Sequence, residues 1–187
     1  MQIAFVNKRL LTAAMIGLIG LSSQAVDIAD HKIVGRVESA LVTDHQIKMN
    51  VRMDTGAQTS SLSATDIEIF KKDGKEWVRF TVDPTRTDKK YRLERPLLRY
   101  IKIRKRHGEL EEVSDIAAGK AFERRPVVSI PVCLGKQSKM VEVSLTDRSH
   151  FNYPMLMGRV GMQSFGILID PTRSFTAKPQ CPSPSNS

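Results

Sequence analysis

Short apolar runs rich in β-branched residues, broken by turn-forming or charged residues, follow one another along most of this chain. No long stretch has the 3.6-residue period of an amphipathic helix, so the pattern predicts an all-β fold. Short helices are expected only around Ser63–Glu68 and Arg159–Phe165. Strands are predicted at Ile33–Val42, Gln46–Met53, Ile67–Phe70, Trp77–Val82, Leu97–Ile103, Val127–Val132, Met140–Leu145 and Gly166–Ile169.

The second predicted strand alternates strictly between apolar and polar residues. Ile47, Met49, Val51 and Met53 fall on one side of it, which indicates a strand with one buried face that runs directly into Asp54. Further along, the Asp73-Gly74 pair separates two strands and predicts a tight hairpin, because both positions of such a turn need positive φ angles.

Two stretches carry too much charge for a core and are expected to be solvated loops or mobile hairpins. They are Asp83–Arg95 and Arg104–Arg125, and the second contains the Glu109–Glu112 cluster.

The N-terminus resembles a secretory signal peptide. Lys8 and Arg9 precede an apolar run from Leu10 to Leu21, and small residues follow up to Ala25. The alternative is an uncleaved membrane anchor, but the run is shorter than the roughly 20 residues that a span needs. We therefore expect a signal peptide at residues 1–25, one domain at 26–177 and a Pro/Ser-rich tail at 178–187 that is disordered unless Cys181 pins it. The expected location is the periplasm or the exterior of a bacterium, with no integral membrane segment after cleavage.

The net charge and the cysteine content limit the kinds of partner and compartment that we expect. Loss of Lys8 and Arg9 with the signal lowers the formal net charge from +9 to +7, which favours anionic partners or simply keeps the surface solvated. No pattern typical of nucleic-acid-binding modules is present, so nucleic acid is not expected as a partner. Cys133 and Cys181 can form a disulfide in an oxidising compartment, but the sequence does not decide whether they pair.

The Asp54-Thr55-Gly56 tripeptide has the parts of half an aspartic peptidase active site. Such a site needs two adjacent carboxylates that share one proton, each held on a tight turn after a core strand. One carboxylate takes a proton from water while the other assists the scissile carbonyl. The alternative is an ordinary turn at a strand end, where Asp and Gly are common.

Several motifs along the chain indicate a family more specifically than the tripeptide does alone. They are Asp54–Leu62, Trp77–Phe80, Glu94–Pro96, Arg124–Val128, Leu145–Arg148 and Met157–Arg159. Together, over roughly Val34 to Phe175, they resemble a bacterial family that was labelled ATP-dependent zinc proteases and is better described as retropepsin-like aspartic peptidases. The older label fits poorly, because no zinc-binding His-Glu-x-x-His helix and no phosphate-binding loop is present, so we assign no metal and no other cofactor.

The resemblance implies a retropepsin-like acid-protease β barrel with Asp54 as the catalytic acid. It also implies that Thr55, Gly56, Ala57, Leu156, Gly158 and Arg159 support the catalytic loop. The chain has one Asp-Thr-Gly, so the second carboxylate is expected from another copy in a two-fold homodimer. Asp147 and Arg148 are expected to form a supporting salt-bridged turn, with a second carboxylate near the cleft as the alternative.

The expected function is therefore that of an aspartic peptidase acting on peptides or proteins. Relatives of this family are associated with ligases that append glutamate, which together with the basic charge favours acidic, glutamate-rich substrates. The alternative is a non-catalytic exported β domain that binds a peptide or an anionic envelope polymer through Arg79, Arg99, Lys102 and Arg104.

Overall fold

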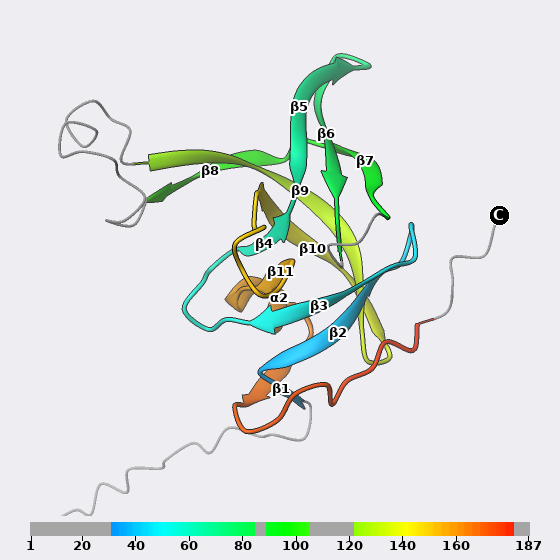
Figure 1. Ribbon diagram of the computed structural model, residues 1–187, viewed down its shortest axis with the longest axis vertical. Coiled ribbons are helices and arrows are strands. Elements are labelled where there is room, and N and C mark those ends of the chain that lie inside the picture. The colour runs from blue at the N-terminus through cyan, green and yellow to red at the C-terminus, as the bar shows by residue number, and fades with distance from the viewer. Residues whose placement is uncertain (1–30, 85–88, 105–121, 182–187) are drawn as a thin grey trace, which may run out of the picture.

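The computed structural model describes residues 31–84, 89–104 and 122–181, and this part of the chain is mainly β (Figure 1). The expected signal peptide and residues 182–187 of the expected tail lie outside it. The described part contains no helix long and apolar enough to cross a membrane. The elements are β1 (Lys32–Gly35), β2 (Val37–Val42), β3 (Ile47–Met53), β4 (Ser60–Ser63), β5 (Thr65–Lys72), β6 (Lys75–Val82), β7 (Tyr91–Pro96), β8 (Arg99–Arg104), β9 (Phe122–Leu134), β10 (Gln137–Thr146), β11 (Met155–Met157), α2 (Arg159–Ser164) and β12 (Ile167–Asp170).

Six strands form a closed barrel, which confirms the predicted fold class. The order around the barrel is β10-β4-β11-β3-β2-β9, and β9 returns to pair with β10. The short β11 closes the gap between β3, to which it is parallel, and β4, to which it is antiparallel. Strand β8 is not one of the six barrel strands, and it pairs antiparallel with the N-terminal half of β9.

The alternation along β3 places its apolar residues inside, as predicted. Ile47, Met49, Val51 and Met53 are buried, whereas the residues between them are exposed. Met155 and Met157 of β11 pack beside them in the same core. The buried face of β3 therefore ends at the residue before Asp54.

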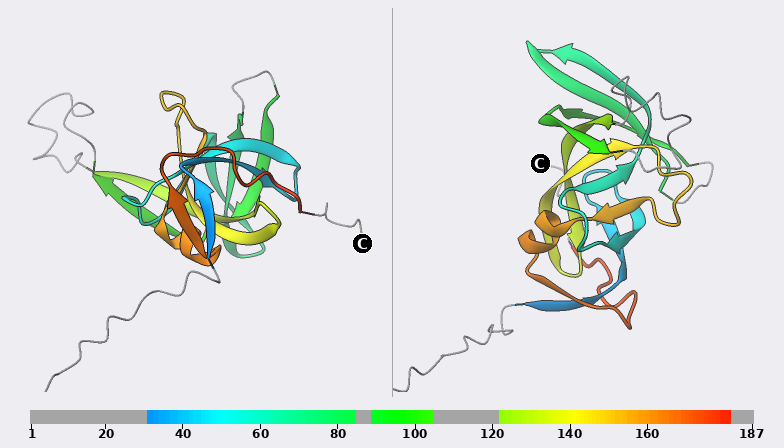
Figure 2. Two further views of the ribbon diagram at one scale, coloured as in Figure 1. Left: turned by 90° about the horizontal axis from the view of Figure 1, so that it is seen from below. Right: turned by 90° about the vertical axis from the view of Figure 1, so that its left-hand side faces the viewer.

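A separate three-stranded sheet, β5-β6-β7, projects from the barrel (Figures 1 and 2). Its β5–β6 turn has positive φ at both Asp73 (50°) and Gly74 (74°), as the predicted hairpin requires. The sheet contacts the barrel core through buried apolar residues of β6 and β7, namely Val78, Phe80, Val82 and Leu93.

One local prediction was wrong. The helix expected at Ser63–Glu68 is the end of β4 and the start of β5, because Ser63 pairs with Thr146 and Thr65 with Thr81. At the two charged stretches, for which solvated loops or mobile hairpins were expected, the structure has paired strands. Asp83–Arg95 contains most of β7, which pairs antiparallel with β6 and buries Leu93. Arg104–Arg125 contains the end of β8 and the start of β9, which pair antiparallel, and residues 105–121 lie outside the described part.

The C-terminal segment after β12 runs back along β2 (Figure 2), and we call residues 171–181 the strap. Its end is fixed at the β9–β10 turn, where Gln180 N donates to Gly135 O (2.6 Å) and Cys181 forms a disulfide with Cys133. In the chain-entropy account, closing a loop of 48 residues contributes roughly 4 kcal/mol. The first residues of the expected tail are thus held in place, the condition under which we expected order there.

A fully buried carboxylate, Glu38 of β2, holds the middle of the strap. Its Oε1 accepts hydrogen bonds from Gly35 N (2.6 Å), Thr176 N (3.0 Å) and Thr176 Oγ1 (2.6 Å), and its Oε2 accepts one from Ala177 N (2.8 Å). Burial raises the pKa of Glu38, but these hydrogen bonds together outweigh it and leave the pKa below its ordinary value. The charged form is therefore the one that stabilises the fold.

We predict that Glu38→Gln destabilises the protein by roughly 1–3 kcal/mol, because its amide N–H would face the Ala177 N–H in place of an acceptor. Since the folded state lowers the pKa of Glu38, wild-type stability should fall as the pH drops below about 4.5, and the variant should lose part of this dependence. Urea unfolding at several pH values measures both effects. The exposed Glu76→Gln is the matched control, and equal stability of the two variants would contradict the prediction.

Candidate active site

Asp54 follows β3 directly and begins a tight loop. Its backbone N donates to Met157 O of β11 (3.0 Å), and its carbonyl accepts a hydrogen bond from Ala57 N (3.3 Å). The carboxylate turns back over the loop, where Oδ1 accepts a hydrogen bond from Gly56 N (2.9 Å). The loop therefore fixes the direction of one carboxylate oxygen through its own backbone.

The first residues of α2 donate hydrogen bonds to this loop. Arg159 N donates to Ala57 O (2.8 Å), Val160 N donates to Gln58 O (3.2 Å), and the Arg159 guanidinium reaches Thr55 O (3.2 Å). Sequence reasoning placed Thr55, Gly56, Ala57 and Arg159 in this supporting group, and the structure brings all four together.

Gly158 is the point of closest approach between the two segments. A Cβ there would lie 2.7 Å from Gln58 O and 2.8 Å from Thr59 C, both backbone atoms. Its N–H donates to the buried Ser60 Oγ (3.1 Å). Position 158 therefore requires glycine for lack of space, with its φ of −82° in the ordinary range.

Asp54 lines a pocket between its own loop and the paired strands β8 and β9. Leu156 also lines it, with residues of β3, β4, β8, β9, β10 and the segment after β10. Within the part of the chain that the structure describes, Asp54 is the one carboxylate that lines this pocket. The cations that line it are Arg52, Arg99, Lys102, Arg104, Arg125 and Arg148.

Sequence reasoning missed two of these cations as site residues. Arg52 lies near the end of β3, two positions before Asp54, and lines the same pocket, so its nearness to Asp54 in the sequence could have identified it. Arg125 reaches the pocket only because β9 pairs with β8 and β10, which no local signal reveals. Of the anion-binding group proposed from sequence, Arg79 lies elsewhere, in ion pairs with Glu94 and Glu68 on the projecting sheet.

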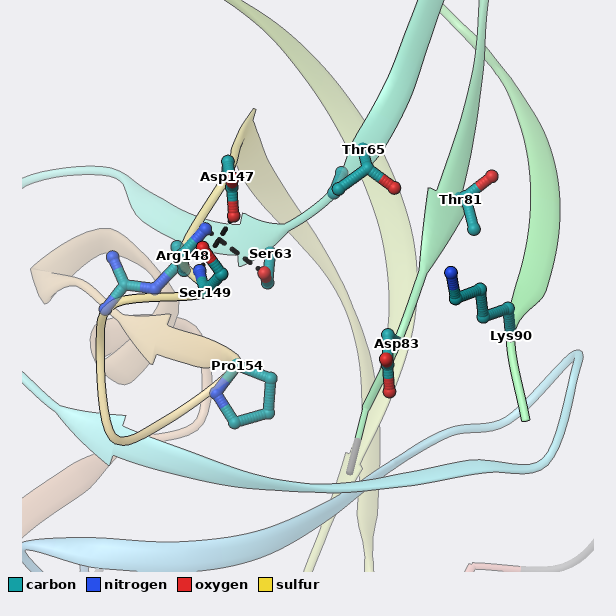
Figure 3. Close-up of a pocket in the computed structure, with 10 residues that line it drawn as sticks. Ser63, Thr65, Thr81, Asp83, Lys90, Asp147, Arg148, Ser149 and Pro154 are labelled. Carbon is teal, nitrogen blue, oxygen red and sulfur yellow. Dashed lines mark hydrogen bonds between the residues drawn. The ribbon is translucent and has the colours of Figure 1, made fainter. Parts of the chain in front are cut away.

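Asp147 and Arg148 have different environments. Asp147 is exposed and accepts a hydrogen bond from Ser149 N (2.7 Å), which together with the Ser149 side chain lowers the pKa of Asp147. It lines a second, smaller pocket with Asp83 and Lys90, and Figure 3 shows the Arg148 guanidinium pointing away from those two residues. Arg148 is buried and faces the Asp54 pocket, so it is Arg148, and not Asp147, that belongs to the surroundings of Asp54.

We predict that Gly158→Ala lowers the free energy of unfolding by roughly 2 kcal/mol, because the added methyl group forces two backbone segments apart. Thermal denaturation followed by circular dichroism measures the loss. Val160→Ala in the same short helix is the control, since Val160 is 50% exposed and should change stability little. Equal melting temperatures for the two variants would show that the loop tolerates a Cβ there.

Comparisons with known proteins agree with this geometry. A family model described as "RimB-like: Retropepsin-like aspartic endopeptidase RimB" matches residues 33–180. The solved structure of protein Lpg0085, of unknown function, from Legionella pneumophila is similar with a TM-score of 0.62 and 31% identity. That match covers 77% of this chain and 96% of the other.

Two relatives are named as probable alpha-L-glutamate ligases. The one from Desulfotalea psychrophila is 34% identical over 148 residues, or 78% of this chain and 29% of the relative. The one from Shewanella halifaxensis is 33% identical over 129 residues, or 68% of this chain and 25% of the relative. This chain thus matches only about a quarter of the length of these proteins. The family match over most of the described fold, with Asp54 on a supported loop in an open pocket, shows that the chain belongs to the RimB-like family of retropepsin-like aspartic endopeptidases.

Proposed function

We propose that the protein is an aspartic peptidase that hydrolyses peptide bonds by activating water between the Asp54 carboxylates of two subunits. The observation that carries the proposal is the placement of Asp54: a carboxylate oriented by its own loop, supported from below by β11 and α2, and facing an open pocket. Family membership supports the same chemistry.

The reaction needs the two carboxylates to share one proton. The ionised Asp54 takes a proton from a water molecule, whose oxygen attacks the scissile carbonyl carbon, while the protonated Asp54 of the partner subunit donates its proton to the carbonyl oxygen. In the second step the carboxylate that took the water proton gives it to the amide nitrogen, a hydroxyl of the tetrahedral intermediate returns its proton to the other carboxylate, and the C–N bond breaks, so the dyad again holds one shared proton. No cofactor takes part.

The homodimer is part of this proposal. Among the described residues that line the pocket, only Asp54 supplies a carboxylate, so one subunit has half of the required pair. Thr55 and Gly56 are exposed at the tip of the loop, where a second copy can approach across a two-fold axis. The exposure of this loop supports an assembly in which the two loops meet.

Acidic, glutamate-rich peptides are the proposed substrates. Among the described residues, six cations and one carboxylate, Asp54, line the pocket, and relatives that contain a domain of this kind are named as probable glutamate ligases. A location in the periplasm or outside the cell is also proposed, on the basis of the N-terminal sequence and the Cys133–Cys181 disulfide.

The alternative is a non-catalytic domain that binds anionic polymers, and the presence of Arg99, Lys102 and Arg104 on the β8 side of the pocket favours it. The two functions differ in their dependence on conditions. A dyad that shares a proton gives a bell-shaped dependence of rate on pH, whereas charge-driven binding weakens steadily with salt.

We predict that Asp54→Asn lowers kcat/KM on a cleaved peptide by at least about 100-fold, because the amide keeps the shape but can no longer accept the proton from water. A pool of diverse peptides, with products identified by mass spectrometry, gives both activity and cleavage preference. Asp147→Asn removes a carboxylate outside the Asp54 pocket and should leave the rate nearly unchanged. Cleavage by the Asp54 variant at the wild-type rate would refute the mechanism.

We also predict that excess Asp54→Asn protein inhibits wild-type protein on mixing. Subunits exchange, and a mixed dimer holds one carboxylate where two are needed. The activity of a fixed amount of wild-type protein should fall toward zero as the variant is added, and sedimentation should give a dimer mass at assay concentrations. Activity that is unaffected by the variant, from a monomeric protein, would rule out the shared site.

A further inference from the structure

The two-stranded ribbon of β8 and β9 has an exposed side that the proposed reaction does not use. Three cross-strand pairs share this side, Tyr100 with Pro126, Lys102 with Arg124 and Arg104 with Phe122. We call Tyr100, Lys102, Arg104, Phe122 and Arg124 the basic face. Its three cations and Phe122 are exposed, whereas the residues between them on each strand are half-buried. The basic face therefore presents three positive charges and an aromatic ring to solvent.

The positive charge of the basic face is not neutralised by the described part of the chain. Lys102, Arg104 and Arg124 form no ion pair within that part. On the opposite side of the ribbon, by contrast, Arg99 pairs with Glu142 (2.6 Å) and Arg125 with Glu123 (2.5 Å). Lys102 also lies directly opposite Arg124, and like charges in that position destabilise a sheet. An external anionic partner would relieve this repulsion.

The two aromatic rings of the basic face have different surroundings. Tyr100 is half-buried, and the Arg124 guanidinium stacks on it, 3.6 Å from the centre of the ring. Phe122 is 53% exposed, although the apolar residues of β8, Ile101 and Ile103, lie on the half-buried side of the ribbon. An apolar ring is unfavourable in water, so the face would gain from a partner that combines negative charge with apolar groups.

We propose that the basic face docks the protein on a lipid surface with anionic headgroups, into which Phe122 inserts. Lysine and arginine are attracted to such headgroups, and phenylalanine enters the boundary between headgroups and acyl chains. A soluble anionic polymer would neutralise the three cations but would leave Phe122 in water. A lipid surface therefore matches both features of the face.

Docking does not depend on the proposed peptidase function, but the two sites are neighbours. Lys102 and Arg104 line the Asp54 pocket and also belong to the basic face, so docking would hold that pocket next to the lipid surface. Phe122 and Arg124 do not line the pocket. Variants at these two positions therefore change the docking face without replacing any residue around Asp54.

Co-sedimentation with lipid vesicles measures docking. The vesicles contain either phosphatidylcholine alone or phosphatidylcholine with phosphatidylglycerol. All proteins share one N-terminus, so any contribution of the N-terminal apolar run is the same in each. We expect tighter binding to the vesicles that contain phosphatidylglycerol. Arg124→Gln should weaken that binding about fivefold, because it removes one charge that is attracted to the headgroups.

Three further variants separate charge, ring and packing. Arg124→Lys keeps the charge without the stacked guanidinium and should bind nearly as tightly as wild type. Phe122→Ser should weaken binding to phosphatidylglycerol vesicles but leave binding to soluble polyphosphate unchanged. Lys139→Gln is the matched control for Arg124→Gln, because Lys139 is exposed on β10 opposite Val132 and lies outside the basic face. Circular dichroism shows whether each variant is folded.

Two outcomes would overturn the proposal. Equal binding to both kinds of vesicle, or equal effects of Arg124→Gln and Lys139→Gln, would show that this face does not dock on anionic lipid. If Phe122→Ser binds phosphatidylglycerol vesicles as tightly as wild type, the face recognises anionic polymers in general and the assignment to lipid fails. Peptide cleavage in solution by Arg124→Gln should match that of wild type, so loss of docking and loss of peptidase activity are distinguishable.

Discussion

The three residues of β11 hold both the barrel and the site together. Met155–Met157 fills the space between β3 and β4, so its two edges complete the barrel wall, and its buried methionines complete the core. The same strand offers Met157 O to Asp54 N and continues through Gly158 into the helix that carries Arg159. Displacement of β11 would therefore open the barrel and release the Asp54 loop in one event. The hydrogen bond from Asp54 N to Met157 O attaches this loop to the core.

Opposite charges are buried at two distant places in the described structure, and they are treated differently. Glu38 accepts hydrogen bonds from four donors of the chain itself, which stabilise its negative charge and thereby the fold. Arg148 lies at the Asp54 pocket, which five other cations also line. Its guanidinium donates to Tyr153 O and Ser61 Oγ and stacks on the Phe151 ring.

Much of the fold could be predicted from the sequence because local pattern and burial agree. The alternation of Ile47–Met53 predicts the strand that forms there, and the Asp73-Gly74 pair predicts the hairpin turn that forms there. The pattern failed where pairing partners decide the outcome. Ser60–Ser63 has no strong strand preference of its own and is extended because β10 and β11 pair with it on both sides. Charged β7 was missed because only Leu93 on it is deeply buried.

Some residues of the candidate site could be predicted from the sequence and others could not. Asp54, Gly158 and Arg159 belong to short motifs that the sequence displays, and Arg52 lies only two residues before the first of them. The position of Arg125 beside Arg148 depends on closure of the barrel, which local sequence does not encode.

The attachment of the strap to Glu38 has a consequence for the order in which the protein folds. Glu38 lies near the start of the domain, whereas Thr176 and Ala177, which satisfy it, lie 138 and 139 residues further along the chain. Synthesis proceeds from the N-terminus, so for most of that time β2 carries a carboxylate that lacks three of its four donors. A barrel formed at that stage would hold Glu38 with the Gly35 N–H alone among these donors, which favours a partly open chain until Thr176 and Ala177 are available. Completion of the fold therefore requires the strap, and a product that lacks it is left without a fully stable native state.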